Sequence, residues 1–211
     1  PDTMDLDKNN DGDIDSITFM VSGEDTGWSS LLWPHMWSLY SVNASINGYE
    51  AYNYTFELLG NSANYHYAVD VGVLAHETFH LIGAPDLYHY YRYDTVHPVG
   101  EWGLMEYNGS TPSHMLGYMK YQYGKWIETV PEITSSGSYT LYPMQDDPNN
   151  VYKINTGQSN EWLYLEYRNN EGLYESNLPS FGLIVYRVDL DYYPNGNVEG
   201  YYDEFGWPAT R

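Results

Sequence analysis

The chain has 211 residues, with 29 acidic against 8 basic side chains, and its formal net charge of −21 would repel nucleic acids and anionic membrane surfaces. Hydrophobic residues make up 42% of it and 25 residues are tyrosine, a composition typical of a folded, β-rich protein that can grip extended polymers. It contains no cysteine, which excludes disulfides and thiolate chemistry, and no apolar run approaches the roughly 18 residues that span a bilayer.

Near the start of the chain, oxygen-bearing side chains occupy every second position around a glycine. They are Asp5, Asp7, Asn9, Asp11, Asp13 and Asp15. Such alternation forms the first part of an EF-hand-like calcium loop, and we take the last five as the calcium ligands. The bidentate glutamate that should close the loop is missing, because the twelfth position is Thr18. We therefore expect a partial calcium loop that pins the following strand, with a solvated acidic turn as the alternative.

Two strands and a helix are expected next. Residues 16–22 (SITFMVS) read as a buried strand, and residues 49–57 (YEAYNYTFE) are aromatic and partly alternating. Residues 71–82 carry apolar side chains at helical spacing, with Asp70 as a suitable N-cap and Gly83 as a stop.

This predicted helix contains the motif H-E-x-x-H. A spacing of four places His76 and His80 on one helix face, where both imidazoles can share a small cation. Glu77 lies one residue round the helix, within reach of a water on that cation. Zinc lowers the pKa of such a water to near neutrality, and a carboxylate can accept its proton as the water attacks a carbonyl. The motif therefore predicts a hydrolytic zinc site, with two structural helix histidines as the weaker alternative.

A third zinc ligand is expected downstream of the motif. Gly83 allows the chain to turn back sharply, and Asp86, three residues further on, stands where the metzincin signature has its third histidine. A carboxylate oxygen is an adequate zinc ligand. Glu101 is the alternative third ligand, since thermolysin-like enzymes use a glutamate from further along the chain. His89 and His97 are weaker rivals and read as loop histidines.

The segment GEWGLMEY, residues 100–107, supplies two further candidate residues for the zinc site. Met105, about twenty residues after the histidine motif, is placed to form the methionine turn that lies beneath the zinc in metzincins. Tyr107 follows two residues later and resembles the astacin-type tyrosine that stabilises the tetrahedral oxyanion. An ordinary core role for Met105 is the alternative.

The second half of the chain has a different pattern. A second helix is expected over residues 113–123, and after Trp126 short runs at 138–142, 161–168 and 182–188 have strand character. The sequence therefore predicts an α+β protein. Residues 1–127 would form a zincin- or metzincin-like catalytic domain, with a mixed twisted sheet and an active-site helix, and residues 128–211 an antiparallel β annex.

Taken together, these motifs resemble the immune inhibitor A family of secreted bacterial metallopeptidases. The resemblance covers nearly the whole chain, and its most specific segment is AHETFHLIGAPDLY. The other matching segments are the acidic loop with its strand, WPHMW at 33–37, WGLM at 102–105, KWI at 125–127, LEYR at 165–168 and GLIVYRVD at 182–189.

The resemblance implies a zincin-type catalytic domain, an inhibitory propeptide in the precursor, and secretion or attachment to the cell surface. The two histidines and the glutamate of the family correspond to His76, His80 and Glu77. The chain departs from the family pattern at Gly103, where an aspartate is usual, and at Arg187, where a histidine is usual.

We therefore expect a secreted zinc endopeptidase whose protein or peptide substrate lies extended along an edge strand formed by residues 49–57. Glu77 would be its general base, zinc its catalytic metal and calcium a structural one. Neither nucleic acid nor a membrane span is expected. The alternatives are a calcium-dependent carbohydrate-binding or adhesion module, a catalytically inactive protease-like scaffold, and a zinc hydrolase acting on a non-peptide bond.

Overall fold

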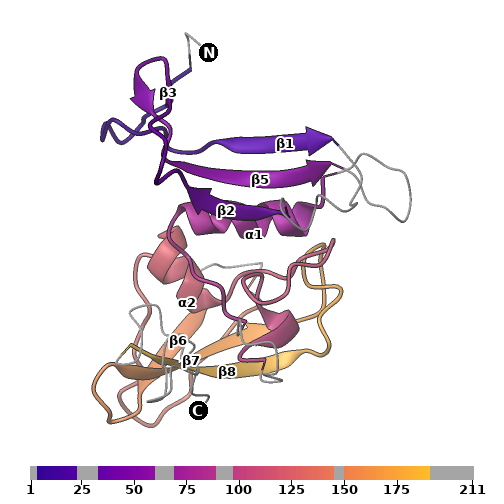
Figure 1. Cartoon of the computed structure of the whole chain (residues 1–211). Coiled ribbons are helices and arrows are strands. Elements are labelled where there is room, and N and C mark those ends of the chain that lie inside the picture. Colours follow the sequence, from indigo (N-terminus) through magenta and orange to yellow (C-terminus); the bar gives the residue numbers. More distant parts are fainter. Residues whose placement is uncertain (1–3, 23–32, 60–68, 89–96, 145–149, 191–211) are drawn as a thin grey trace, which may run out of the picture. The chain divides into compact units, whose positions relative to one another are not determined.

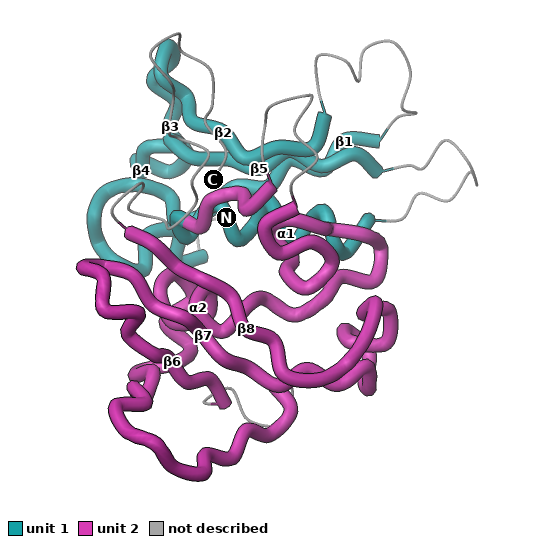
Figure 2. Tube along the Cα trace, turned by 90° about the horizontal axis from the view of Figure 1, so that it is seen from below, with its two compact units in different colours: residues 1–83 teal, residues 84–211 magenta. Residues whose placement is uncertain are grey.

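The computed structural model describes residues 4–22, 33–59, 69–88, 97–144 and 150–190. The described chain is mixed α+β, with few helices and several small sheets, as predicted (Figure 1). It divides into two compact units, residues 1–83 and residues 84–211, which Figure 2 colours separately. This boundary lies within the stretch predicted as the catalytic domain. The division at residue 127 stays a prediction.

Unit 1 is built on a three-stranded sheet in the order β1-β5-β2. β1 (Thr18–Ser22) runs parallel to β5 (Asn53–Leu59), and β2 (His35–Ser38) runs antiparallel to it. β1 confirms a strand within residues 16–22, but the expected burial is wrong, since Phe19 and Met20 are each 49% exposed. β2 was not predicted as a strand. The predicted edge position of residues 49–57 is wrong: β5 is the central strand, because both of its sides are paired. Among the described strands, β2 is the antiparallel strand at an edge of this sheet.

The helix α1 (Val71–Leu81) lies along one face of this sheet and packs against β5 and β2 (Figure 1). Its start is set by Asp70, whose Oδ1 accepts hydrogen bonds from the backbone N–H groups of Gly72 and Val73 at 2.9 and 3.3 Å. These bonds satisfy two donors that a helix N-terminus otherwise leaves unpaired. Its end is set by Gly83, which has a φ of +90° and donates its N–H to the carbonyl of His80. The predicted helix and both of its boundaries are confirmed.

The remainder of unit 1 is the acidic loop and a short hairpin of β3 (Ser45–Ile46) and β4 (Tyr49–Glu50). The stretch predicted as one strand is thus two strands, interrupted at Ala51 and Tyr52. The loop is joined to the hairpin by two backbone hydrogen bonds, from Ile14 N–H to the Glu50 carbonyl and from Glu50 N–H to the Gly12 carbonyl. The loop therefore has a defined position within unit 1.

Unit 2 contains a three-stranded antiparallel sheet, β6 (Val151–Asn155), β7 (Glu161–Arg168) and β8 (Gly182–Asp189). It confirms an antiparallel sheet in the second half of the chain. β6 was not predicted, and residues 138–142 form no strand, only an isolated bridge from Pro143 to Tyr167.

The helical part of unit 2 starts later than predicted. The 3-10 turn η1 (Gly100–Trp102) is followed by α2 (Gly117–Met119) and the π-helical turn η2 (Lys120–Gly124). α2 packs against β7 at Gly117, where a Cβ atom would lie 2.9 Å from Val151 Cγ2 and 3.0 Å from Glu166 Oε2. Only glycine allows so close an approach without a shift of these side chains.

A buried arginine ties these elements together. The side chain of Arg168 in β7 is fully buried and donates hydrogen bonds to both oxygens of Glu175 and, at 3.0 Å, to Glu166 Oε1. It also donates to the carbonyls of Trp102 at 2.9 Å and His114 at 3.4 Å. Burial opposes its charge, but the two glutamates outweigh that effect and raise the pKa of Arg168. One side chain thus connects the sheet to the segments before α2.

Replacing this arginine should destabilise the fold. Arg168→Met leaves two buried carboxylates without their counter-charge, and we expect a loss of about 3–5 kcal/mol in the free energy of unfolding, measured by urea denaturation. The control is Arg187→Met. Arg187 is half-exposed and pairs with Glu161 at 3.4 Å, so its loss should cost roughly 0–1 kcal/mol. Equal effects of the two substitutions would refute the structural role of Arg168.

Candidate metal centre

The two motif histidines face each other on α1. The Nε2 atoms of His76 and His80 are 3.2 Å apart, and the ring planes stand at 89° with centroids 4.7 Å apart. His76 is buried at 2% exposure, and His80 is partly buried, one turn further along the helix. The two rings therefore point their Nε2 atoms at a shared point beside the helix.

Asp86 joins this pair, six residues beyond His80 and after the turn at Gly83. One ligand atom from each of His76, His80 and Asp86 lies within 4.8 Å of the other two, and Asp86 is buried at 8% exposure. Within the described residues, no other set of three histidine, aspartate or glutamate side chains meets this test. Glu101 is not part of the group, and His89 lies outside the described residues.

The donor set fits zinc. Two nitrogens bound about 2.0–2.1 Å from one tetrahedral zinc lie roughly 3.3 Å apart, close to the 3.2 Å between the two Nε2 atoms. Two imidazoles and one carboxylate are also a common set of protein ligands at catalytic zinc sites, which keep the fourth position open. Calcium and magnesium prefer oxygen ligands alone, so this group does not suit them.

Two further carboxylates belong to the same region of unit 1. Glu77 is in α1 next to His76 and is buried at 7% exposure. Glu57, in the central strand β5, is buried at 1% exposure, and its Oε1 has no hydrogen-bond partner. Burial, followed by the negative charges of Glu77 and Asp70, raises the pKa of Glu57 to about 7. Since both charges come from α1 and its cap, Glu57 faces the motif helix from the sheet.

Glu57 was not singled out from the sequence. The signal was present: an acidic residue stands in the middle of a strand between buried or half-buried neighbours such as Phe56 and Leu58. A carboxyl in that position costs free energy unless it is neutral or paired, and such costs concentrate at functional sites.

In unit 2, the predicted methionine forms the inside of a turn. The N–H groups of Glu106 and Tyr107 both donate to the carbonyl of Gly103 at 3.0 Å, and Met105, which lies inside this turn, is 1% exposed. The Met105 carbonyl accepts a hydrogen bond of 2.8 Å from Leu87 N–H, so the residue after Asp86 is tied to this turn. Tyr107 follows with its side chain half-exposed.

Gly103 lies at a closely packed position. A Cβ atom at Gly103 would lie 3.2 Å from Val99 Cγ2 and 3.4 Å from Leu116 Cγ. A side chain there would crowd these two residues, and glycine avoids the contact.

Hydrogen bonds from backbone N–H groups to side-chain oxygens of the same segment hold the acidic loop in shape. Asp7 is buried at 7% exposure and accepts the N–H groups of Asp11 and Gly12 at 3.0 and 2.9 Å. Asn9 accepts a second bond from Asp11 N–H, and Asp11 accepts the N–H of Asp13 at 2.9 Å. The predicted ligand Asp15 accepts the N–H of Lys8 at 3.0 Å. These bonds shape a tight turn, and calcium binding there stays a prediction.

Comparison with known proteins gives no match for this chain, either to a family model or to a curated protein sequence. Among the described residues, no helix combines the length and the apolar character that crossing a membrane requires.

The raised pKa of Glu57 makes stability depend on pH. The pKa of Glu57 in the folded protein, about 7, exceeds the ordinary value of 4.5. The stabilisation that comes from keeping this carboxyl neutral is therefore complete below pH 4.5 and is lost as the pH rises through 7. In chelator-treated protein, urea unfolding at pH 5 and pH 8 should show a smaller fall in stability for Glu57→Gln than for the wild type. Glu50→Gln, at an exposed glutamate of unit 1, is the control. Identical pH dependence in all three proteins would contradict this account.

The third ligand can be assigned by comparing two substitutions. Asp86→Ala should weaken zinc binding by about 10- to 1000-fold, because it removes one of three protein ligands, whereas Glu101→Ala should leave the zinc affinity within about twofold. The measurement is a competition titration with a chromophoric chelator. His97→Ala, at a side chain that is 75% exposed, is a further control that should keep zinc. Loss of zinc from Glu101→Ala alone would assign the ligand to Glu101.

Proposed function

We propose that this protein is a secreted zinc endopeptidase that cleaves peptide bonds in protein substrates. The observation that carries the proposal is the group of His76, His80 and Asp86, with Glu77 adjacent to it on the same helix. Two imidazoles and a carboxylate beside a buried glutamate are the elements that a metal-dependent hydrolase requires.

Bound zinc would lower the pKa of a water molecule and polarise the scissile carbonyl. Glu77 has the role of general base and then general acid: its carboxylate takes the proton of the attacking water and passes it to the leaving amine. Burial of Glu77 suits this role, because a carboxylate held away from bulk water keeps the proton for the leaving group. Asp70 supports Glu77 as general base and as general acid, because it fixes the first turn of the helix that carries Glu77.

The substrate is proposed to bind as an extended strand. Of the strands that the structure describes, β2 lies at the antiparallel edge of the sheet that carries α1, and main-chain hydrogen bonds to such an edge are independent of the substrate sequence. Tyr107 is proposed to donate its hydroxyl to the developing oxyanion, a role for which its half-exposed side chain is available.

The resemblance to the immune inhibitor A family supports this proposal and extends it. It adds a zincin- or metzincin-like fold around α1, an inhibitory propeptide in the precursor, release from the cell or attachment to its surface, and a structural calcium ion in the loop of Asp7 to Asp15.

A second candidate function is carbohydrate binding, and one observation favours it. Trp37 and Tyr40 are exposed at 54% and 68% and contact each other edge to face, and Tyr40 also contacts Tyr52. Exposed rings can stack on sugars. Binding of the zinc-free protein in a glycan screen, lost on Trp37→Ala, would favour this function over proteolysis.

The general base can be tested by one substitution. Glu77→Ala should reduce cleavage of casein by about 100- to 10,000-fold while the zinc content stays that of the wild type, because Glu77 moves a proton and does not bind the metal. Glu128→Ala, which removes an exposed glutamate of unit 2, should change neither quantity. Full activity of Glu77→Ala would refute the mechanism.

A further inference from the structure

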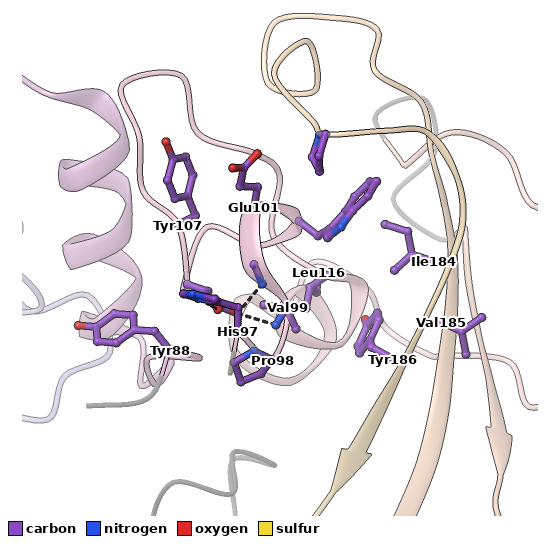
Figure 3. Close-up of a pocket in the computed structure, with 14 residues that line it drawn as sticks. Tyr88, His97, Pro98, Val99, Glu101, Tyr107, Leu116, Ile184, Val185 and Tyr186 are labelled. Carbon is purple, nitrogen blue, oxygen red and sulfur yellow. Dashed lines mark hydrogen bonds and ion pairs between the residues drawn. The ribbon is translucent and has the colours of Figure 1, made fainter. Parts of the chain in front are cut away.

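Unit 2 contains a pocket of about 720 Å³, and of its lining residues only Tyr107 has a role in the mechanism proposed above. Its volume lies within the range of about 300–1,000 Å³ that is usual for ligand sites. It is lined by the segment from His97 to Trp102, by Glu106 and Tyr107, and by residues of β8 (Figure 3). All of these lie within one unit, so the pocket is a property of unit 2 by itself.

The charged side chains of this pocket are acidic. The side chain of Glu106 is 2% exposed, and its Oε2 accepts the backbone N–H groups of Val99 and Gly100, while its Oε1 pairs with His97 Nδ1 at 3.1 Å. Glu101 is exposed at the same pocket, and Figure 3 shows its carboxylate on the side of Tyr107. None of the described residues that line the pocket is a lysine or an arginine. The pocket therefore favours a positively charged ligand.

The walls of the pocket are largely apolar. Leu116, Ile184 and Val185 contribute aliphatic surface, and Trp102 contributes an indole ring. A ligand that matches both the walls and the carboxylates has an aliphatic stem with a cationic end. A guanidinium suits such a site better than an ammonium, because it is planar, stacks on aromatic faces and pairs with a carboxylate through two hydrogen bonds.

We propose that this pocket binds an arginine side chain of a peptide, with Glu101 as its charge partner and the apolar walls around its stem. That the peptide is a substrate rests on the proposed endopeptidase function, whereas the binding itself does not. Glu101 is then a residue that determines specificity. Glu106 is already held by two N–H groups and His97, so it adds negative charge and shapes the wall.

The test is peptide binding in the Glu77→Ala background, where cleavage is prevented. Fluorescence anisotropy would compare labelled pentapeptides that carry arginine or its neutral isostere citrulline at the central position. We expect the arginine peptide to bind about fivefold more tightly, and the difference to shrink in high salt. Glu101→Gln should abolish this preference. Glu128→Gln, with the same change of charge at an exposed site away from the pocket, should retain it.

Equal binding of the two peptides, or a preference for arginine that survives Glu101→Gln, would overturn the proposal. Loss of zinc from Glu101→Gln would also overturn it, since Glu101 would then be a metal ligand. Cleavage by the protein with Glu77 intact is measured separately. If the arginine preference is present and no peptide or casein is cleaved, the pocket assignment stands and the endopeptidase function fails.

Discussion

The 3.2 Å between the Nε2 atoms of His76 and His80 is the distance on which the functional account depends, and helix geometry sets it. A spacing of four brings two side chains to the same face one turn apart, but only a helix with a fixed start and a packed face holds both rings in one orientation. Here Asp70 caps the first turn, and β5 and β2 cover one face of α1. Gly83 then ends the helix, and Asp86 is the sixth residue after His80.

A second constraint acts within unit 2. The carbonyl of Trp102 accepts a hydrogen bond from Arg168, whose charge is balanced by two buried glutamates. The carboxylate of Glu106 holds the N–H groups of Val99 and Gly100. These contacts fix both ends of the segment that carries Glu101 and leads into the Met105 turn. The same buried charges that stabilise the unit thus shape the pocket, and a specific pocket needs such a rigid wall.

Much of the metal site could be predicted from the sequence because its determinants are local. The cap at Asp70, the spacing of four and the turn at Gly83 each act within a few residues, and the structure confirms α1 and its boundaries. Sheet order was harder, because strand pairing depends on contacts between distant segments. Residues 49–57 were expected at an edge because they precede the motif helix, yet β1 and β2 pair with both sides of β5. Glu57 was missed for a similar reason, since its neighbours Asp70 and Glu77 belong to the helix that follows much later in the chain.

The central claim is that zinc held by the motif histidines drives peptide cleavage, and a stepwise reconstitution tests it most directly. Zinc would be added in known amounts to the chelator-treated protein, with casein cleavage and bound zinc measured at each step. The account predicts no cleavage without metal, a rise in proportion to bound zinc, and saturation at one zinc per chain. Cleavage by the metal-free protein, or tight binding of one zinc with no cleavage of casein or of a peptide library, would contradict it.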